Sequence, residues 1–403
     1  MPTPPIPAPM LSPQFFADTS PVYAWLREHD PVHKIELINT WFVSRHADAV
    51  QILDDNENFS VEGMPVSHAW APEVQSIMRT LFMDDPDHAR LRGVVNDFFK
   101  PSAVKRREGK VQAIIDDAIA GIKASGEQVI DIQKQFAYTV PIDVLSMVLG
   151  LPKEDFELFH AWAPRLNAAL MPMQTEEMRA DGAKVAIEVR DYLINLMKNG
   201  NVRPDGEDTV MSLLVDGVRN GVMTEDELAP QAVQLYIGGH ETTLHLIGLT
   251  LHALLTHPEE KAKVMADPSR AIKAVEETVR WDGVSHGIGR RVVNDYELHG
   301  VTMKANDMIF IGNASSNRDP NVFENPDEFD LDRKGRAAHL GFGRGLRYCL
   351  GQNLAKLETR LAIVSFFEAF PDAKLVEGFV PEYGQNLMMR GHTTLPVNLY
   401  GDA

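Results

Sequence analysis

The chain has one cysteine, Cys349, in the segment Phe342-Gly343-Arg344-Gly345-Leu346-Arg347-Tyr348-Cys349-Leu350-Gly351. A strongly helical stretch follows from Gln352. A glycine-rich turn before a helix N-terminus offers free backbone N–H groups, which help to keep a thiol ionised at neutral pH. A single cysteine excludes an intrachain disulfide and any multi-cysteine zinc or iron–sulfur site. Cys349 is therefore either a buried structural thiol or a lone metal ligand.

A second group of reactive residues lies in the longest helical stretch, Glu225–Thr256, which contains Ile237-Gly238-Gly239-His240-Glu241-Thr242. Each glycine weakens a helix by roughly 1 kcal/mol relative to alanine, so a structural purpose is needed for both. Close helix packing is one explanation, and an opening for small molecules is another. Glu241 and Thr242 form an acid–alcohol pair that could relay protons, although a buried glutamate could also be a structural hydrogen-bond partner.

The spacing F-G-x-G-x-R-x-C-x-G resembles the haem-binding loop of the bacterial cytochromes P-450. A chance arrangement would have to place three glycines, an aromatic residue and an arginine around one cysteine. The resemblance implies haem b as cofactor, with Cys349 as the axial ligand to the iron. It also implies that Phe342, Gly343 and Gly351 lie beside the macrocycle and that Arg347 reaches a haem propionate.

The same family has a buried E-x-x-R pair that braces this loop, and the chain has Glu277 and Arg280 at that spacing. On a helix, positions i and i+3 share one face. Arg318 and Arg333 are candidates for the third member of the network, and Arg333 is preferred. An isolated pair of this kind is more often a solvated surface contact.

Two further motifs resemble the family's propionate-binding residues. His88 and Arg92 lie at i and i+4 on an expected helix and would hold propionates, although an ordinary amphipathic helix start explains them too. Arg290 aligns with a third propionate arginine, and its neighbour Arg291 leaves that assignment open by one position. Gly238 and Gly239 would open a groove over the iron, with Thr242 and Glu241 delivering protons for dioxygen activation.

Helical periodicity covers most of the chain, and strand signals are few. The expected helices are 20–29, 47–54, 71–81, 88–99, 103–125, 136–149, 153–170, 176–199, 208–220, 225–256, 258–267, 269–281 and 352–369. The expected strands are 32–36, 40–43, 290–298, 301–303, 308–313, a short one near Leu375 and one at 395–399. No repeat or linker divides the chain, so the expectation is one mainly α domain over residues 1–403 with small β-sheets. The resemblance implies that this domain has the cytochrome P-450 fold, a helical bundle that encloses haem. Residues 1–19 are expected to form an extended proline-rich arm.

Composition limits location and partners. Thirty-nine basic against fifty-seven acidic residues give a net charge of −18, which disfavours nucleic-acid and membrane binding. The N-terminus lacks a signal-peptide pattern, and the longest apolar stretch, about a dozen residues, is too short to cross a bilayer. A soluble, cytoplasmic monomer is expected. The resemblance implies that electrons come from NAD(P)H through a separate ferredoxin and ferredoxin reductase. The ferredoxin would dock on a basic face formed by Lys105, Arg106, Arg107, Arg344, Lys356 and Arg360.

The expected reaction is insertion of one oxygen atom from O2 into a small to medium apolar organic substrate. The substrate-facing residues by analogy are apolar apart from one histidine: Val233, Ile237, His286, Ile288 and Met388. A haem-thiolate peroxygenase is one alternative, which would not need Glu241 and Thr242. A non-enzymatic haem sensor is another, but no signalling or DNA-binding segment accompanies the motifs.

Overall fold

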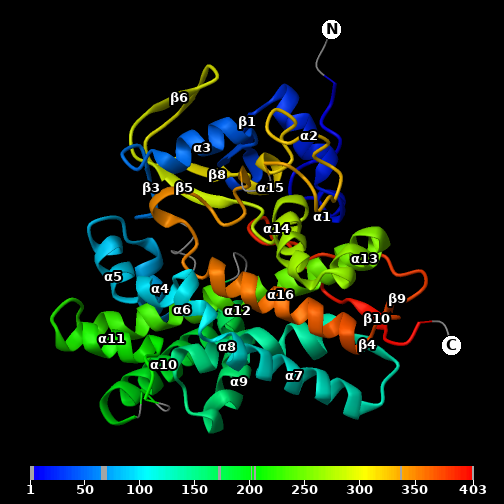
Figure 1. Cartoon of the computed structure of the whole chain (residues 1–403). Coiled ribbons are helices and arrows are strands. Elements are labelled where there is room, and N and C mark those ends of the chain that lie inside the picture. Colours follow the sequence, from blue (N-terminus) through cyan, green and yellow to red (C-terminus); the bar gives the residue numbers. More distant parts are fainter. Residues whose placement is uncertain are drawn as a thin grey trace. The chain divides into compact units, whose positions relative to one another are not determined.

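The computed structural model describes residues 4–64, 70–170, 174–200, 202–203, 206–335 and 338–401. Helices predominate among these residues, and the strands are few and short (Figure 1). The prediction of a mainly helical fold with small β-sheets is therefore confirmed. The first three residues of the predicted N-terminal arm lie outside the described residues.

The chain forms two compact units. Unit 1 comprises residues 1–60, 112–140 and 242–403, and unit 2 comprises residues 61–111 and 141–241. Three helices contain residues of both units: α7 (Glu108–Ser125), α8 (Thr139–Leu149) and α12 (Glu225–Thr256). That residues 1–403 form a single haem-thiolate domain stays a prediction.

Unit 1 contains a group of packed helices. The face of α14 that carries Ala271, Ala274, Val275, Thr278 and Val279 is buried, and α14 packs against α16 (Figure 1). This spacing repeats every three to four residues and is the pattern of an amphipathic helix. The helices are α1 (Pro13–Ala17), α2 (Ser20–His29), α3 (His46–Asp54), α13 (Pro258–Ala266), α14 (Ala271–Trp281), α15 (Asn313–Ser316) and α16 (Gln352–Ala369), with a π-helical turn η5 (Gln133–Ala137) and 3-10 turns η1 (Glu36–Ile38), η7 (Pro268–Arg270) and η9 (Gly345–Arg347).

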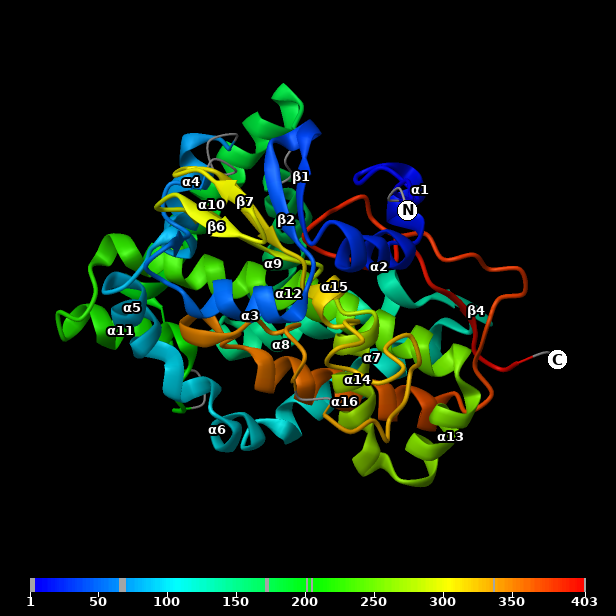
Figure 2. The same cartoon turned by 90° about the horizontal axis from the view of Figure 1, so that it is seen from above.

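A five-stranded sheet with the order β1-β2-β8-β5-β3 also belongs to unit 1. Its strands are β1 (Val32–Ile35), β2 (Thr40–Val43), β3 (Phe59–Ser60), β5 (Ile288–Val292) and β8 (Met308–Ile311). Strands β2 and β8 run parallel, with Trp41 opposite Ile309, and the other neighbours are antiparallel. Figure 2 shows β1 and β2 side by side in blue.

Both faces of this sheet are covered by apolar side chains. Ile309 and Ile311 join one buried cluster, whereas Phe310, between them, joins another with Phe42 and Ile35. Successive side chains of a strand point to opposite faces, so a strand buried on both sides is apolar throughout. This explains why the sequence of β8, Met-Ile-Phe-Ile, does not alternate.

The described part of unit 1 also contains two smaller sheets. One has the order β4-β10-β9, formed by β4 (Val129–Asp131), β10 (Pro396–Asn398) and β9 (Lys374–Leu375). The other is the hairpin of β6 (Tyr296–Leu298) and β7 (Val301–Met303), shown in yellow in Figure 2. Its two-residue turn has positive φ at His299 and Gly300, as tight hairpin turns require.

Unit 2 is helical. Helix α10 packs against α9 and α4, and α11 packs against α5. A Cβ added at Gly182 of α10 would lie 2.6 Å from the Cβ of Ala169 in α9, so this glycine permits close helix approach. The helices that lie wholly in unit 2 are, among the described residues, α4 (Pro72–Met78), α5 (Asp87–Val95), α6 (Pro101–Lys105), α9 (Phe156–Ala169), α10 (Glu176–Asn199) and α11 (Val210–Arg219), with 3-10 turns η3 (Arg79–Phe82), η4 (Asn96–Phe99) and η6 (Lys153–Asp155).

The structure corrects two local predictions. The arm expected to be extended over residues 1–19 contains α1, because the Ser12 side chain accepts the backbone N–H of Phe15 and Pro13 occupies the first turn. The strand expected over residues 290–298 is two strands, β5 and β6. The chain turns between them at Asp295, whose carboxylate accepts the backbone N–H of Ala305 and pairs with Lys304.

Several expected helices are also shorter or divided. The helix expected over residues 103–125 is interrupted at residues 106–107 between α6 and α7, and that expected over 88–99 ends in the 3-10 turn η4. Among the described residues, no helix combines the length and the apolar character needed to cross a bilayer.

Candidate functional site

The loop that carries Cys349 leads directly into α16. Its backbone turns through Gly343 and Gly345, whose φ angles of 72° and 69° lie in the left-handed region that favours glycine. The backbone N–H of Cys349 donates to the carbonyl oxygen of Phe342 at 2.8 Å, and the Cys349 side chain is half-buried. Gly351 is the N-cap of the 18-residue helix α16. The thiol therefore lies beside a helix N-terminus, where the helix dipole favours the anionic form.

The loop is also attached to α3. The Nε of Arg344 donates to both carboxylate oxygens of Asp54, at 3.0 and 2.8 Å. A Cβ added at Gly345 would lie 3.2 Å from the carbonyl oxygen of Leu53, so the two backbones approach closely. These contacts restrict the loop on the side that faces α3.

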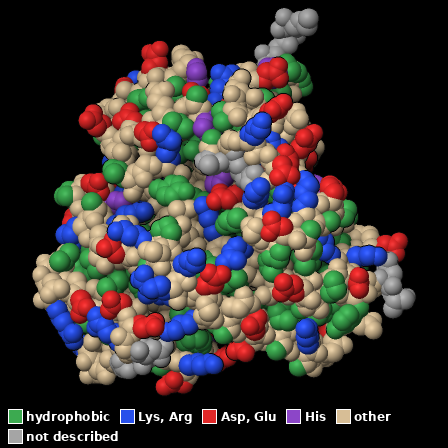
Figure 3. Space-filling model, in the orientation of Figure 1, with side chains coloured by type: hydrophobic (Ala, Val, Ile, Leu, Met, Phe, Trp, Pro, Cys, Tyr) green, Lys and Arg blue, Asp and Glu red, His purple; other side chains and the backbone are tan. Residues whose placement is uncertain are grey.

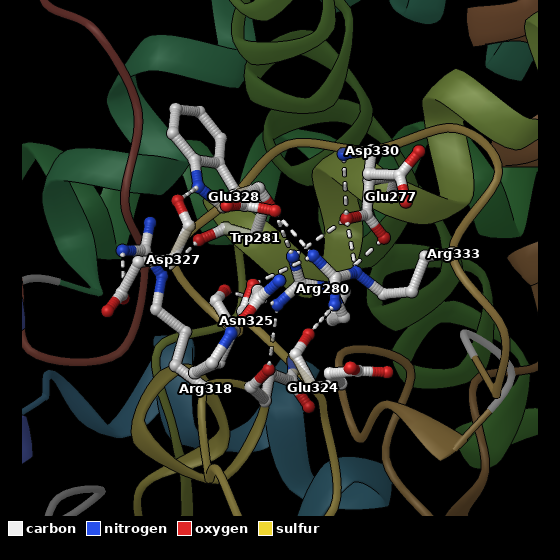
Figure 4. Close-up of polar contacts among 12 residues, drawn as sticks. Glu277, Arg280, Trp281, Arg318, Glu324, Asn325, Asp327, Glu328, Asp330 and Arg333 are labelled. Atoms are coloured by element: carbon white, nitrogen blue, oxygen red, sulfur yellow. Dashed lines mark hydrogen bonds and ion pairs between the residues drawn. The ribbon is translucent and has the colours of Figure 1, made fainter.

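Glu277, Arg280 and Arg333 meet in a buried network (Figure 4). Arg280 donates through Nε and Nη2 to the two oxygens of Glu277, at 3.0 and 2.7 Å. Arg333 Nε donates to Glu277 Oε1 at 2.8 Å. Burial lowers the pKa of Arg280, while its hydrogen bonds to Glu277 raise it. The other guanidinium nitrogens donate to backbone carbonyls, those of Asn317, Glu324, Asn325, Pro326 and Glu328.

Arg318, the other candidate for the third member, has different partners. Its Nε donates to the carbonyl oxygen of Trp281 at 2.7 Å, and its Nη1 pairs with Asp327 at 3.1 Å. The structure thus places Arg333, and not Arg318, on Glu277.

The network is connected to the cysteine loop through Asn317. The carbonyl oxygen of Asn317 accepts Arg280, and its side-chain oxygen accepts the backbone N–H of Leu340 at 2.6 Å. Next to Leu340, a Cβ added at Gly341 would lie 2.3 Å from Cγ1 of Val279 in α14. The start of the loop therefore packs directly on the helix that carries the E-x-x-R pair.

Arg290 and Arg291 occupy opposite faces of β5. Arg290 is 6% exposed, and its Nη1 donates to the carbonyl oxygen of Gly289. Arg291 is half-buried, and its Nη1 donates to Asn306 at 3.2 Å. Of the two, Arg290 is thus the arginine directed into unit 1.

His88 and Arg92 lie one turn apart on α5 in unit 2, and both are half-buried. The Nδ1 of His88 lies 3.1 Å from Oδ1 of Asp85, which also accepts the backbone N–H of Ala89. This contact orients the imidazole at the start of the helix.

The two glycines of α12 have different surroundings. A Cβ added at Gly239 would lie 2.7 Å from Cδ2 of Leu145 in α8, whereas one added at Gly238 would meet no protein atom within 4 Å. Gly239 therefore permits helix packing, and Gly238 faces open space. The helix stays α-helical through both positions.

Glu241 and Thr242 follow on the same helix, and both are half-buried. The neighbouring Thr243 is 2% exposed. His240 is also 2% exposed, and its ring stacks on that of Tyr236, with centroids 6.3 Å apart. The packing of His240 is that of a structural side chain within unit 2.

The expected substrate-facing residues are distributed over both units. In unit 2, Val233 is buried and Ile237 is half-buried. In unit 1, Ile288 lies beside the cysteine loop, since its Cδ1 is 3.5 Å from a Cβ added at Gly343. Met388 is 45% exposed as a residue. Its carbonyl oxygen accepts the backbone N–H of His286 at 2.9 Å.

His286 is turned toward α2. Its Nδ1 lies 3.3 Å from the hydroxyl of Tyr23, and burial lowers its pKa to about 3. It lines a cavity of about 270 Å³ within unit 1, together with Tyr23, Arg27, Asp282 and Arg390. Arg390 donates to Asp282 at 2.9 Å in this cavity. The residues that line this cavity do not include Ile288 or Met388, although the backbone of His286 is bonded to that of Met388.

Sequence reasoning missed a cluster next to the cysteine loop. Glu276, one residue before the E-x-x-R pair, contacts both His339 and Lys356. Lys356 was expected to contribute to a basic docking face, yet its side chain is only 16% exposed. The i, i+4 spacing of Gln352 and Lys356 was a visible signal, because such residues meet on one helix face.

Other residues of the expected basic face are also engaged. Arg344 pairs with Asp54, and the guanidinium of Arg107 lies 3.6 Å from the ring centroid of Phe98. Figure 3 shows basic side chains interspersed with acidic ones over the visible face. The docking face stays a prediction.

Comparison with known proteins agrees with these observations. The cytochrome P450 family model matches residues 4–373. The vitamin D(3) 25-hydroxylase of Pseudonocardia autotrophica is 33% identical over 403 residues, which cover 97% of this chain and 96% of the relative. The 6-deoxyerythronolide B hydroxylase of Saccharopolyspora erythraea is 30% identical over 406 residues, with 97% and 98% coverage.

Solved structures give the same result. Epothilone B-bound cytochrome P450epoK superposes with a TM-score of 0.89 at 27% identity, covering 97% of this chain and 99% of that one. The family model spans most of the chain, and the hydroxylase relatives are aligned over nearly their full lengths. The chain therefore belongs to the cytochrome P450 family of haem-thiolate monooxygenases.

Proposed function

We propose that this monooxygenase uses haem b bound through Cys349 to insert one oxygen atom of O2 into a small to medium apolar organic substrate. When bound, haem supplies the redox chemistry of dioxygen activation. The observation that carries the proposal is the Cys349 loop: a half-buried thiol beside the N-terminus of α16, held in a glycine turn. These features suit a thiolate that would hold the haem iron.

The remaining cofactor contacts are proposed from charge and burial. Arg290, buried in unit 1, and the half-buried Arg347 would each donate to a propionate. His88 and Arg92, one turn apart on α5, would do the same from unit 2. Phe342, Gly343 and Gly351 would lie beside the macrocycle, and the open space at Gly238 suits a group that comes close to α12.

The network of Glu277, Arg280 and Arg333 would act as a brace for the loop. Its path to Leu340 through Asn317 supports that role. A buried and fully hydrogen-bonded cluster has one favoured arrangement, so it can hold the loop in one position. These residues would not contact the substrate.

Glu241 and Thr242 would carry protons on α12. The Thr242 hydroxyl would donate a hydrogen bond to the oxygen that is being reduced, and the Glu241 carboxylate would pass protons to it from solvent. Reduction of one oxygen atom of O2 to water takes up two protons, so loss of this relay would lower the amount of product formed per dioxygen consumed.

The substrate is proposed to be apolar. Ile237 and Ile288 are half-buried apolar residues next to Gly238 and Gly343, respectively. Val233 and Met388 would complete an apolar lining, while His286 would be a less direct contributor because it faces α2. Vitamin D(3) and 6-deoxyerythronolide B, named for two relatives, are suitable first probes.

Electrons are proposed to come from NAD(P)H through a ferredoxin reductase and a ferredoxin, to a monomeric, cytoplasmic enzyme. A basic docking face for the ferredoxin would be formed by Lys105, Arg106, Arg107, Arg344 and Arg360. Lys356 is excluded from that role in this proposal, because its ammonium already pairs with Glu276.

Replacement of a single hydroxyl tests the proposal. Thr242→Val should lower product formed per dioxygen consumed by about tenfold or more and release hydrogen peroxide instead. Thr243→Val removes the same hydroxyl from the next residue and should keep the wild-type ratio. The assay would use purified holoprotein, a surrogate ferredoxin, its reductase and NADPH, with vitamin D(3) and 6-deoxyerythronolide B as probes.

The alternatives predict other outcomes. A peroxygenase would form product from hydrogen peroxide without electron donors, and Thr242→Val would not change its yield. A haem sensor would bind haem through Cys349 but would not consume dioxygen with either probe. Equal coupling in Thr242→Val and the wild type would contradict the proposed proton relay.

A further inference from the structure

We propose that Glu276 and Lys356 form a charged positioning pair whose two opposite charges act, and balance each other, on the midpoint potential of the haem through the Cys349 loop. This inference rests on the proposed function, because it takes Cys349 as the axial ligand. Neither residue would touch the substrate or the reacting oxygen. The pair would act through Phe342, which contacts both the pair and the backbone of Cys349.

The pair has close geometry. Lys356 Nζ of α16 lies 2.6 Å from Oε1 of Glu276 on α14. The side chains are 16% and 24% exposed, so the pair is partly removed from water. A charge interaction in such a place is screened less than one on the surface. The electric field of each charge therefore reaches neighbouring groups with less screening than the field of a surface ion pair.

A histidine fixes the other oxygen of Glu276. His339 Nε2 lies 2.7 Å from Oε2 of Glu276, while the backbone N–H of Gly341 donates to Nδ1 of the same ring at 3.3 Å. Nδ1 is thus an acceptor, which leaves Nε2 to carry the hydrogen and donate it to the carboxylate. Burial opposes ionisation of Glu276, but the hydrogen bonds from His339 and Lys356 outweigh it and lower the pKa to about 2.

Lys356 is held over the ring of Phe342. Its Nζ lies 4.8 Å from the ring centroid, and it also donates to Oε1 of Gln352 at 2.6 Å. A cation over an aromatic face is attracted by the ring and stays in place. The carbonyl of Phe342 accepts the backbone N–H of Cys349. Phe342 therefore contacts both the ammonium of Lys356 and the turn that carries Cys349.

The two charges should have opposite effects. A positive charge near the loop stabilises the reduced state, which carries one more negative charge, and a negative charge destabilises it. In Lys356→Met the carboxylate of Glu276 remains alone, so the potential should fall. In Glu276→Gln the ammonium remains alone, so the potential should rise. A pair that served only as packing would not give shifts of opposite sign.

Redox titration of the purified holoprotein tests this inference. Each single variant should change the ferric-to-ferrous ratio at a fixed potential by about tenfold, which is about 59 mV for a one-electron couple. The double variant Glu276→Gln/Lys356→Met should return close to the wild-type value. Lys304→Met, which removes the exposed ammonium that pairs with Asp295 next to the β6–β7 hairpin, is the matched control and should leave the potential unchanged.

Shifts in the same direction in both single variants, or no shift in either, would overturn the inference. If Lys356→Met does not fold, the sign of the shift in Glu276→Gln decides alone, and a fall contradicts the inference. The carbon monoxide spectrum of each reduced variant separates the two proposals. A thiolate-type band with unchanged potentials would reject only the positioning pair, whereas its absence in the wild type would reject the proposed ligand.

Discussion

The Nε of Arg333 lies 2.8 Å from Oε1 of Glu277, although 56 positions separate the two residues in the sequence. Glu277 is fully buried and Arg333 is 9% exposed, so the ion pair lies inside unit 1. Together with Arg280, it joins α14 to the segment that precedes the cysteine loop (Figure 4). The stability of this region should therefore depend on keeping all three charges.

Removal of the Glu277 charge should destabilise the fold strongly. Glu277→Gln leaves two buried guanidinium groups without their counter-charge, and the expected loss is about 3–5 kcal/mol in the free energy of unfolding. Urea unfolding would measure it. Glu297→Gln, at an exposed position of β6, is the control and should change stability by less than about 0.5 kcal/mol. Equal stability of the two variants would contradict the claim that the network of Glu277, Arg280 and Arg333 stabilises this region.

Gly239→Ala should destabilise the protein through one contact. The new Cβ would lie 2.7 Å from Cδ2 of Leu145, and overpacking of this kind costs about 1–3 kcal/mol. Thermal unfolding would show a lower midpoint, and Gly239→Ala/Leu145→Ala should lose less than the sum of the two single changes. Gly121→Ala, on an exposed face of α7 with no atom within 4 Å of the new Cβ, should be neutral or stabilising. Additive losses in the double variant would refute the contact.

Buried histidines should make the protein less stable in acid. Burial lowers the pKa of His286 and of His392 to about 3. Between pH 6.5 and pH 3 these two imidazoles therefore stay unprotonated in the folded protein, whereas the same imidazoles take up protons in the unfolded chain. Stability should then fall as the pH falls through this window, by at most about 1.4 kcal/mol per pH unit for each histidine. In His392→Phe, which keeps a ring beside Tyr383, the slope from urea unfolding at pH 7 and pH 5 should be smaller. An unchanged slope would show that His392 does not contribute.

Glu358 should make the protein less stable as the pH rises, which is the opposite of the effect of the buried histidines. Burial raises the pKa of this carboxyl well above its usual range, so the folded state keeps the proton that the unfolded chain loses above about pH 4.5. Stability from this group is present below that pH and is lost as the pH rises toward the folded pKa. Glu358→Gln should therefore gain stability relative to the wild type at pH 7.5 but not at pH 4. Glu368→Gln, exposed on the same helix, is the control, and an equal gain in it would contradict the assignment.

Local patterns predicted much of the fold. The apolar face of α14 repeats at helical spacing, so this helix was predictable to within two residues of its observed limits. The pairing of Glu277 with Arg333 required more, because it joins distant segments. It was predictable only through the family's arrangement, and Arg318 was an equally basic candidate whose observed partners are Trp281 and Asp327.

Tertiary contacts decided what the sequence left open. Two adjacent glycines look alike in a sequence, yet only Gly239 meets α8, at Leu145. Lys356 resembled a solvated base on a helix, because its partner Glu276 belongs to another helix and lies far away in the sequence. The N-terminal arm contains a helix because its two phenylalanines, Phe15 and Phe16, find a buried site that proline content does not reveal.

The central claim is that Cys349 ligates the iron of haem. The most direct measurement is the Soret band of the reduced, carbon monoxide-bound protein, recorded for the wild type and for Cys349→Ala. A strongly red-shifted band in the wild type that is absent from the variant is the predicted result. A band at the same position in both proteins, or no haem in the wild type, would contradict the claim.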